Sequence, residues 1–357
     1  MNVAIIGGGL AGLSCAHELE RYGIQPTIFE VNSFIGEQYP HVGAALEIAT
    51  RSIGDPIKYF KNQLNLNIKP INTVNRIIHH SPTKTTVIKG KLGYFFNRSK
   101  ECDDLKVQIH SMLKKPNILF NTYGDYEPLS QKFDYVIIAN GQSNFSKELG
   151  CWTEWVNTFV RGAVVLGDFD PNAIIIWLNK EYCKNGYAYL TPFDKKRASL
   201  ILVVTDVSKS EVDHYWELFL YSENIKCPLV EEFKLNHQSG RVYPHKVDNI
   251  LLTGNAGGVI DPFLGFGVLG SVVTGVMAAR SIILNKPYDK LIEGILKTNL
   301  QLYEFRKALN SVDNDAYDKI VSSIGLPGVR QLIYKSPINI IKYGSYVLKA
   351  MPKKEKR

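Results

Sequence analysis

Cysteine is sparse in this sequence, and the cysteines lie far apart. Cys15, Cys102, Cys151, Cys183 and Cys227 are odd in number, and no two of them form a Cys-x-x-Cys pair. This spacing argues against a disulfide framework and against a zinc site, and it fits a reducing intracellular setting. We therefore expect a cytoplasmic protein that binds no metal.

Long apolar runs are also missing. The chain has no uninterrupted apolar stretch of about 18 residues, so we expect no membrane-spanning helix. We find no internal repeat, no low-complexity segment and no signal peptide, because the first apolar run covers only residues 3–6. With 357 residues, of which 45% are hydrophobic, the chain can form one large or two modest domains.

The formal net charge is +8, which favours anionic partners. Basic residues gather in the last stretch, 342–357, and apolar residues precede them from residue 338. The segment 334–357 therefore fits a peripheral membrane contact, although a solvated tail explains the same residues equally well. Nucleic acid is not an expected partner.

A glycine turn follows the first apolar run. Residues 3–6 are typical of a buried parallel strand, residues 10–22 have helical spacing, and residues 26–30 form a second strand. Strand, glycine turn, helix and strand within about 30 residues predict a βαβ unit that binds a dinucleotide.

The residues of the turn each have a physical role in holding a pyrophosphate. Gly7 lets the chain turn sharply, Gly9 lets the backbone approach the phosphates, and Gly12 lets the helix pack against the strand. Leu10 and Ala11 supply backbone N–H groups at the helix N-terminus, which attracts anions.

An acidic residue completes this first motif. Glu30 stands at the end of the second strand, where its carboxylate can accept hydrogen bonds from ribose hydroxyls. NAD fits these residues as well as FAD does, and a tight turn without a ligand is the alternative.

A second glycine-rich loop lies between residues 254 and 267. A buried strand, 249–253, precedes this loop, and a helix rich in small residues, 268–284, follows it. This order again predicts that an anion, or a group that becomes anionic, is held at the start of a helix.

Several residues of the second loop are candidates for contacts with a flavin. Gly254 ends the strand, and Asn255 can hydrogen-bond the ribityl chain or the pyrophosphate. Gly265 and Gly267 allow the loop to approach the ring system, and Val268 begins the helix.

The second loop resembles the second flavin motif of the p-hydroxybenzoate-hydroxylase-like FAD-dependent oxidoreductases and, within that superfamily, the geranylgeranyl reductase family. The residues that carry the resemblance are Gly254, Asn255, Ala256, Gly257, Pro262, Gly265 and Gly267. That family usually has Asp in place of Asn255, so this chain keeps the hydrogen-bond acceptor and loses its charge. The resemblance implies that the cofactor is FAD.

Two further segments support the resemblance on the cofactor side. Residues 134–141, with Ala139 and Gly141, resemble the strand that closes the nucleotide-binding sheet near the pyrophosphate. Arg98, followed by residues 103–105, resembles the arginine and helix that face the flavin chain.

The substrate side matches the family less closely. Residues 186–192 resemble the signature Tyr-x-Trp-x-Phe-Pro, with Tyr189 in place of Trp and Thr191 in place of Phe. The cysteine and glycine segment of the family corresponds here to residues 41–47, which contain no cysteine. The resemblance therefore implies a cavity that is more polar, or differently shaped, than is usual in the family.

We expect an α/β fold whose FAD-binding domain is Rossmann-like. Residues 1–150 and 246–290 form this domain, with small β insertions, and residues 31–48 are a loop. Residues 151–245 form an inserted antiparallel β-sheet domain for the substrate, and residues 291–357 form a helical C-terminal segment that is broken at Pro327 and Pro337.

Three side chains are candidates for lining the cavity. Tyr187 and Tyr189 alternate on one strand face, so they either line a cavity or pack within the sheet. For His41, a solvent-exposed loop position is favoured over a position facing the flavin. Asp261 either caps its loop or helps to orient the isoalloxazine ring, and the capping role is favoured.

The resemblance implies hydride transfer from reduced flavin to a carbon–carbon double bond of an isoprenoid-like or other apolar substrate. The sequence has no further glycine motif that would bind a nicotinamide. The flavin is therefore reduced either by NAD(P)H that docks transiently or by a ferredoxin-like donor. One alternative is an FAD-dependent monooxygenase of an aromatic or apolar compound. Another, suggested by the basic charge, is a flavin-binding protein with a non-catalytic or RNA-associated role.

Overall fold

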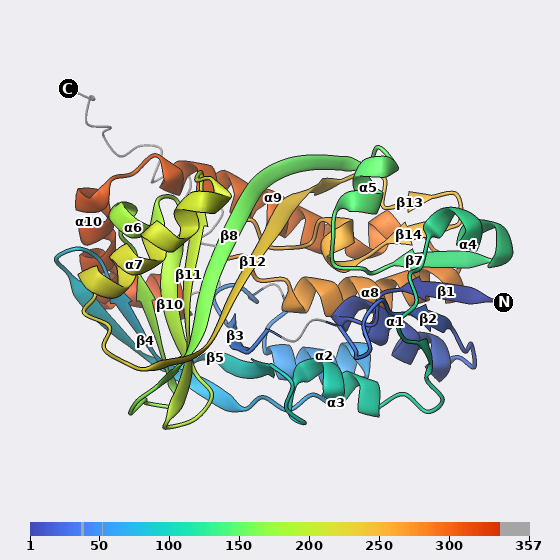
Figure 1. Cartoon of the computed structure of the whole chain (residues 1–357), viewed down its shortest axis with the longest axis horizontal. Coiled ribbons are helices and arrows are strands. Elements are labelled where there is room, and N and C mark those ends of the chain that lie inside the picture. Colours follow the sequence, from blue (N-terminus) through green and yellow to red (C-terminus); the bar gives the residue numbers. More distant parts are fainter. Residues whose placement is uncertain (37–38, 52, 336–357) are drawn as a thin grey trace.

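The computed structural model describes residues 1–36, 39–51 and 53–335. Two sheets organise this part of the chain, with the six-stranded sheet at the right of Figure 1 and the eight-stranded sheet at the left. The N-terminus lies at the end of the six-stranded sheet.

The six-stranded sheet contains the predicted βαβ unit. In spatial order its strands are β13 (Lys246–Val247), β14 (Ile250–Leu252), β7 (Tyr135–Ile138), β1 (Val3–Ile6), β2 (Thr27–Phe29) and β6 (Asn117–Leu119). All neighbours pair in parallel except β13 and β14. The fully apolar sequence of β1 is buried at every position, as a strand covered on both faces requires.

Helices cover both faces of this sheet. On one face, α1 (Leu10–Arg21) and α8 (Val268–Ile283) share a core in which Leu13 and Val272 are completely buried. On the other face lie α4 (Tyr126–Lys132) and α5 (Asn144–Glu148), whose Tyr126 and Phe145 belong to a second core.

The eight-stranded sheet is larger than expected. Its order is β12 (Leu229–Val242), β8 (Trp152–Leu166), β11 (Arg197–Thr205), β10 (Tyr187–Pro192), β9 (Ala173–Trp177), β4 (Asn72–His80), β5 (Thr85–Arg98) and β3 (His41–Leu46). One face carries α6 (Lys180–Cys183) and α7 (Val212–Ser222). The short turn η1 (Lys209–Glu211) links β11 to α7.

Three expectations about this sheet were wrong. The sheet is mixed, because β4 pairs with β9 in parallel, with Arg76–His80 beside Ala173–Trp177. It therefore takes β3, β4 and β5 from within the segment 1–150, where only small β insertions were expected. Residues 41–46 are also a strand rather than part of a loop, because they pair with β5 along their whole length.

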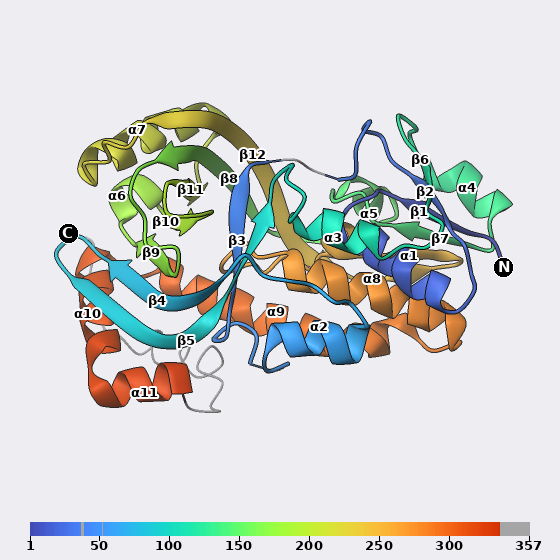
Figure 2. The same ribbon diagram turned by 90° about the horizontal axis from the view of Figure 1, so that it is seen from below.

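The described part of the C-terminal segment, up to residue 335, is helical, as predicted. It comprises α9 (Tyr288–Asn310), α10 (Asn314–Gly325) and α11 (Pro327–Lys335), and Figure 2 shows α10 and α11 below the β4–β5 hairpin. Asp318 of α10 accepts hydrogen bonds from Ser81 and Thr83 of this hairpin. Proline is tolerated in the first turn of a helix, so Pro327 starts α11 and ends α10.

The expected membrane contact falls on residues 334–357, nearly all of which lie outside the described residues. None of the described helices is long and apolar enough to cross a membrane. Two further helices, α2 (Pro56–Leu64) and α3 (Leu105–Ser111), pack against the core of α1 and α8, and each starts at an aspartate cap, Asp55 and Asp104.

Candidate active site

The glycine turn after β1 has two tightly packed positions and one open position. A Cβ atom on Gly7 would lie 2.5 Å from the Ala139 carbonyl oxygen, and the residue has a positive φ of +106°. A Cβ on Gly12 would lie 2.0 Å from the Gly7 carbonyl oxygen, whereas a Cβ on Gly9 would meet nothing within 4 Å. Packing therefore requires Gly7 and Gly12, and the open side of the loop at Gly9 leaves room for a ligand.

Glu30 lies beside this turn and is only 3% exposed. Its carboxylate accepts hydrogen bonds from the Gly8 N–H at 2.7 Å and from the Asn32 N–H at 2.9 Å. It thus joins the glycine turn to the loop after β2. The contact to a ribose that the sequence predicts for Glu30 stays a prediction.

Two helices start next to each other without a side-chain cap. The N-cap residues are Gly9 for α1 and Gly267 for α8, and neither end has a capping hydrogen bond from a side chain. The helices pack closely, because a Cβ on Gly275 of α8 would lie 2.2 Å from the Ala11 carbonyl oxygen. Uncapped helix N-termini present free N–H groups and a partial positive charge. Such a pair of helix starts fits the anionic and electron-accepting parts of FAD.

The remaining predicted cofactor residues lie near these helix starts. Ala139 continues β7 and donates to the Ile6 carbonyl at 2.8 Å, and a Cβ on Gly141 would meet nothing within 4 Å. Asn255, in the short turn η2 (Gly254–Gly257), places its Oδ1 3.2 Å from where a Cβ of Gly267 would be. The structure therefore brings the two glycine motifs together around the starts of α1 and α8.

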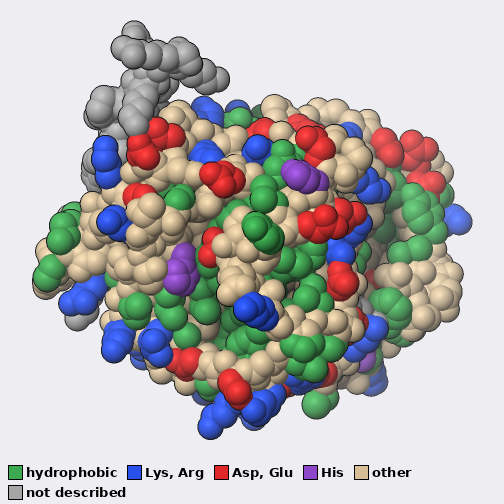
Figure 3. Space-filling model, turned by 60° about the vertical axis from the view of Figure 1, so that its left-hand side comes forward, with side chains coloured by type: hydrophobic (Ala, Val, Ile, Leu, Met, Phe, Trp, Pro, Cys, Tyr) green, Lys and Arg blue, Asp and Glu red, His purple; other side chains and the backbone are tan. Residues whose placement is uncertain are grey.

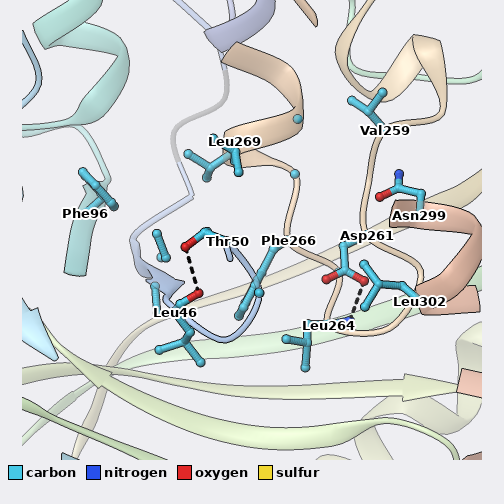
Figure 4. Close-up of a pocket in the computed structure, with 18 of the residues that line it drawn as sticks. Leu46, Thr50, Phe96, Val259, Asp261, Leu264, Phe266, Leu269, Asn299 and Leu302 are labelled. Carbon is cyan, nitrogen blue, oxygen red and sulfur yellow. Dashed lines mark hydrogen bonds between the residues drawn. The ribbon is translucent and has the colours of Figure 1, made fainter. Parts of the chain in front are cut away.

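A cavity of about 380 Å³ lies between the eight-stranded sheet, the loop before α8 and helix α9. Figure 4 shows Leu46, Phe96, Leu269 and Leu302 around it. Gly265, Gly267 and Val268 also line it, so the cavity reaches the start of α8. The ionisable residues of its wall are His41, Tyr59, Arg98, Tyr187, Tyr189, His237 and Asp261.

His41 lines this cavity from β3, so the favoured interpretation of an exposed loop histidine was wrong. Its strand partner in β5 is Arg98, which also lines the cavity. Burial and the positive charge of Arg98 lower the pKa of His41 to about 3, so its imidazole is neutral near pH 7. The buried Nε of Arg98 has no hydrogen-bond partner among the described residues.

Tyr187 and Tyr189 both face the cavity, and they also pack on each other. Their rings stack with centroids 5.6 Å apart. The two residues therefore both line the cavity and pack within the sheet. The Tyr187 hydroxyl donates a hydrogen bond to the Leu264 carbonyl in the loop before α8. Tyr187 therefore connects the sheet to the loop, and Tyr189 lines the cavity beside it.

Asp261 caps the loop before α8, as expected. Its Oδ1 accepts hydrogen bonds from the Phe263 N–H at 2.7 Å and the Leu264 N–H at 3.1 Å. Burial raises the pKa of this carboxyl to about 6, and the two backbone N–H groups oppose the shift.

Sequence reasoning missed Arg306, which fixes the same loop from α9. This side chain is 4% exposed and donates to four oxygens, those of Pro262, Phe263, Asn185 and the Thr205 hydroxyl, within 3.3 Å. His237 of β12 was missed as well, and burial lowers its pKa to about 4. No motif marks either residue, because each enters the site only through the tertiary contacts of its element.

The described residues contain no group of three His, Cys, Asp or Glu side chains placed to hold a metal ion. The five cysteines are free thiols, and none of them lines the cavity.

Comparisons with known proteins agree with this geometry. Residues 1–151 match the family described as pyridine nucleotide-disulphide oxidoreductase. A digeranylgeranylglycerophospholipid reductase from Methanocaldococcus jannaschii is 23% identical, and the alignment covers 96% of this chain and 97% of the relative.

Solved structures show the same fold. A geranylgeranyl bacteriochlorophyll reductase-like protein from Thermoplasma acidophilum superposes with a TM-score of 0.75 at 16% identity, covering 97% of this chain and 98% of that one. The flavin-dependent halogenase CmlS superposes with a TM-score of 0.62 at 16% identity, covering 98% of this chain and 76% of the halogenase. The predicted fold class, the resemblance to geranylgeranyl reductases and the prediction of an FAD-dependent oxidoreductase are confirmed.

Proposed function

We propose that this FAD-dependent oxidoreductase of the geranylgeranyl reductase type reduces a carbon–carbon double bond in an isoprenoid-like or other apolar substrate. The observation that carries the proposal is the cavity of about 380 Å³, whose walls are largely apolar and which reaches the loop at the start of α8. The name of the archaeal relative indicates a reductase of a lipid with geranylgeranyl chains, and this chain aligns with nearly its full length.

The six-stranded sheet and the helices beside it would bind and orient FAD. The open side of the glycine turn at Gly9 and the uncapped starts of α1 and α8 would hold the pyrophosphate and the flavin edge. Glu30, Ala139, Gly141, Asn255 and Pro262 belong to the same proposed binding surface. When bound, reduced FAD supplies a hydride to the substrate.

The walls of the cavity would select the substrate and exclude water. Leu46, Phe96, Leu264, Leu269 and Leu302 give walls on which an apolar chain can be buried, and each buried CH₂ group contributes roughly 0.8 kcal/mol to binding. His41 is neutral near pH 7, so it adds no charge to this wall. The Arg98 guanidinium, which also lines the cavity, would then face an anionic group of the cofactor or of the lipid.

The test is a single-turnover experiment. The protein is loaded with FAD, reduced with dithionite without oxygen, and mixed with digeranylgeranylglycerophospholipid. We expect the absorbance of oxidised flavin to return and the lipid to gain two hydrogen atoms per reduced double bond in mass spectra. A lipid of the same length with saturated chains is the control, and it should leave the flavin reduced. Flavin that stays reduced with every alkene offered contradicts the proposal.

The same material separates the alternatives. A monooxygenase would consume oxygen when NAD(P)H and substrate are added, and its product would gain an oxygen atom. On the face drawn in Figure 3, basic and acidic side chains are interspersed and hydrophobic side chains appear between them. A nucleic-acid surface gathers basic residues on one face, so this face gives no support to an RNA-associated role.

The electron donor is tested in parallel. NAD(P)H and a reduced ferredoxin are each added to the oxidised, FAD-loaded protein in the absence of oxygen, and bleaching of the flavin is followed. We expect at least one of the two donor classes to bleach it.

A further inference from the structure

Reduction of a carbon–carbon double bond needs a proton as well as a hydride, because one carbon of the alkene receives each of them. We propose that Asp261 is the proton donor of this reaction. The proposal rests on the proposed function and adds to it the acid that delivers the proton at the cavity wall.

The position of the Asp261 carboxyl fits this role. The residue lies in the loop between η2 and α8, lines the cavity and is 7% exposed (Figure 4). Oδ1 holds the Phe263 and Leu264 N–H groups, whereas Oδ2 has no hydrogen-bond partner among the described residues. The carboxyl is therefore fixed through one oxygen and has the other oxygen free for a substrate.

The backbone that carries Asp261 is itself held in place. The Asp261 N–H donates to the Phe266 carbonyl at 3.0 Å, and the Gly265 N–H donates to the Asp261 carbonyl at 2.9 Å. Arg306 binds the carbonyls of residues 262 and 263, and Tyr187 binds that of residue 264. A group that is positioned before the substrate arrives loses less entropy in the reaction than a mobile group.

The other ionisable groups of the cavity are poorly suited to donate a proton near neutral pH. Burial and Arg98 lower the pKa of His41 to about 3, and burial lowers that of His237 to about 4, so both imidazoles are already neutral. Burial raises the pKa of Tyr187 and Tyr189 above the ordinary tyrosine range, which makes both hydroxyls weaker acids. Asp261 is the one carboxylic acid among the described residues that line the cavity.

The surroundings of Asp261 keep its proton available. Arg306 of α9 and Tyr187 of β10 interact with it electrostatically, and His237 of β12 lies 3.2 Å from where a Cβ of Gly265 in the same loop would be. Arg306 favours the carboxylate, but burial outweighs it and raises the pKa to about 6. An apolar substrate that displaces water from the cavity would disfavour the charged form further.

The proposed step is balanced in atoms and electrons. The Oδ2–H bond of Asp261 breaks and its proton forms a C–H bond with one alkene carbon, while the hydride from reduced flavin forms a C–H bond with the other. The π bond of the substrate is lost, the flavin is oxidised by two electrons, and the Asp261 carboxylate regains a proton from water after product release. A nicotinamide or ferredoxin-like donor then reduces the flavin again.

The decisive variants are Asp261→Asn and Asp261→Ala. Asparagine keeps an Oδ1 that can accept from Phe263 and Leu264 but has no acidic proton, whereas alanine removes both functions. We expect Asp261→Asn to bind FAD with unchanged Kd, to keep KM within about threefold, and to lose kcat by at least about 100-fold. Asp168→Asn, which removes an exposed carboxylate far more accessible than Asp261, is the control and should retain the wild-type kcat.

The pH profile gives a readout that a structural role would not change. In the wild type, kcat/KM should fall tenfold per pH unit above about pH 6, as the acid loses its proton. In Asp261→Asn the residual kcat/KM should not fall with this titration. The solvent deuterium isotope effect on kcat should also differ between this variant and the wild type.

A second readout needs no turnover. The Asp261 carboxyl should contribute a component of stability that is lost as the pH rises from about 4 to about 6, because the folded state binds the Asp261 proton more tightly than the unfolded state. Asp261→Asn should lack this component, which urea unfolding at several pH values would measure. Equal pH dependence in the two proteins overturns the inference.

The outcomes separate this inference from the proposed function. If the wild type reduces alkenes and Asp261→Asn does so at the same rate while Asp261→Ala does not, Asp261 only caps its loop and the proposal is overturned. If the wild type reduces no alkene at all, the proposed function fails and the proton donor fails with it.

Discussion

The glycine turn after β1 and the wall of the cavity are built from different parts of the chain. At the turn, backbone atoms occupy the space, so that a Cβ on Gly7 or Gly12 would come within 2.5 Å of a carbonyl oxygen. At the cavity, side chains from β3, β10, β12 and α9 form the surface. The first region depends on the absence of side chains and the second on their identity.

Under the function proposed above, the first region would hold the cofactor and the second would select the substrate. A binding site made of backbone atoms tolerates few substitutions, because any side chain displaces the chain itself. A wall made of side chains can change its shape and charge while the strands and helices behind it stay in place. The halogenase that shares this fold shows that one architecture can carry another chemistry.

The largest effect should come from the turn itself, where Gly12→Ala and Gly9→Ala form a matched pair. In Gly12→Ala the new Cβ would lie 2.0 Å from the Gly7 carbonyl oxygen, so we expect a loss of more than about 3 kcal/mol in unfolding free energy. In Gly9→Ala the Cβ meets open space, so stability should stay within about 0.5 kcal/mol while FAD binds at least about tenfold more weakly. Urea unfolding without FAD and titration of flavin fluorescence measure the two effects. Equal stability of the two variants would contradict the distinction.

Arg306→Met tests whether the stability of the fold also depends on a side chain beside the cavity. The substitution leaves the oxygens of Pro262, Phe263, Asn185 and Thr205 without their donor. Because unsatisfied buried acceptors are costly, we expect a loss of about 2–4 kcal/mol in unfolding free energy. Lys307→Met, next to it on the exposed side of α9, should change stability by less than about 0.5 kcal/mol. A wild-type melting curve for Arg306→Met would show that the loop holds without α9.

His41, in the wall of the cavity, should make the free energy of unfolding depend on pH, which the glycine turn does not. Its pKa is about 3 in the folded protein and about 6.5 in the unfolded chain. The unfolded state therefore binds the extra proton below pH 6.5, and the folded protein loses up to about 1.4 kcal/mol per pH unit as the pH falls from there. His41→Asn should remove this component between pH 6.5 and 5. A difference between the two proteins that does not grow with acidity would show that His41 is solvated.

The smallest effect should distinguish the two tyrosines of β10. Tyr187→Phe removes the hydrogen bond to the Leu264 carbonyl, so we expect a loss of about 1 kcal/mol in stability. The Tyr189 hydroxyl has no hydrogen-bond partner among the described residues, so Tyr189→Phe should cost less than about 0.5 kcal/mol. Calorimetry of the two variants side by side measures the difference, and the reverse order would mean that the loop does not depend on β10.

The cofactor half could be predicted from the sequence because its signals are local. The apolar run 3–6, the glycines after it and the small-residue helix from 268 each stand in one short segment, and the structure has β1, α1 and α8 there. Backbone turns of this kind need specific residues in a specific order, so the sequence reveals them directly.

The cavity half could be predicted only in part, because its contacts join distant segments. The parallel pairing of β4 with β9 connects residues about 100 positions apart, and no local pattern specifies it. The same holds for Arg306, which has the sequence context of an ordinary helix residue. Residues 41–46 looked like a loop because a strand with small residues has a weak pattern until its partner is known.

The long antiparallel pair of β8 and β12 has a mechanical consequence. The two strands stay hydrogen-bonded from Trp152 and Val242, at the edge of the six-stranded sheet, to Val165 and Leu229 at the far end of the eight-stranded sheet, with two register shifts between (Figure 1). Rotation of one sheet against the other would have to bend this ladder along its length. We therefore expect the two halves to melt in one calorimetric transition, and access to the cavity to be controlled by loops and side chains rather than by a hinge between domains.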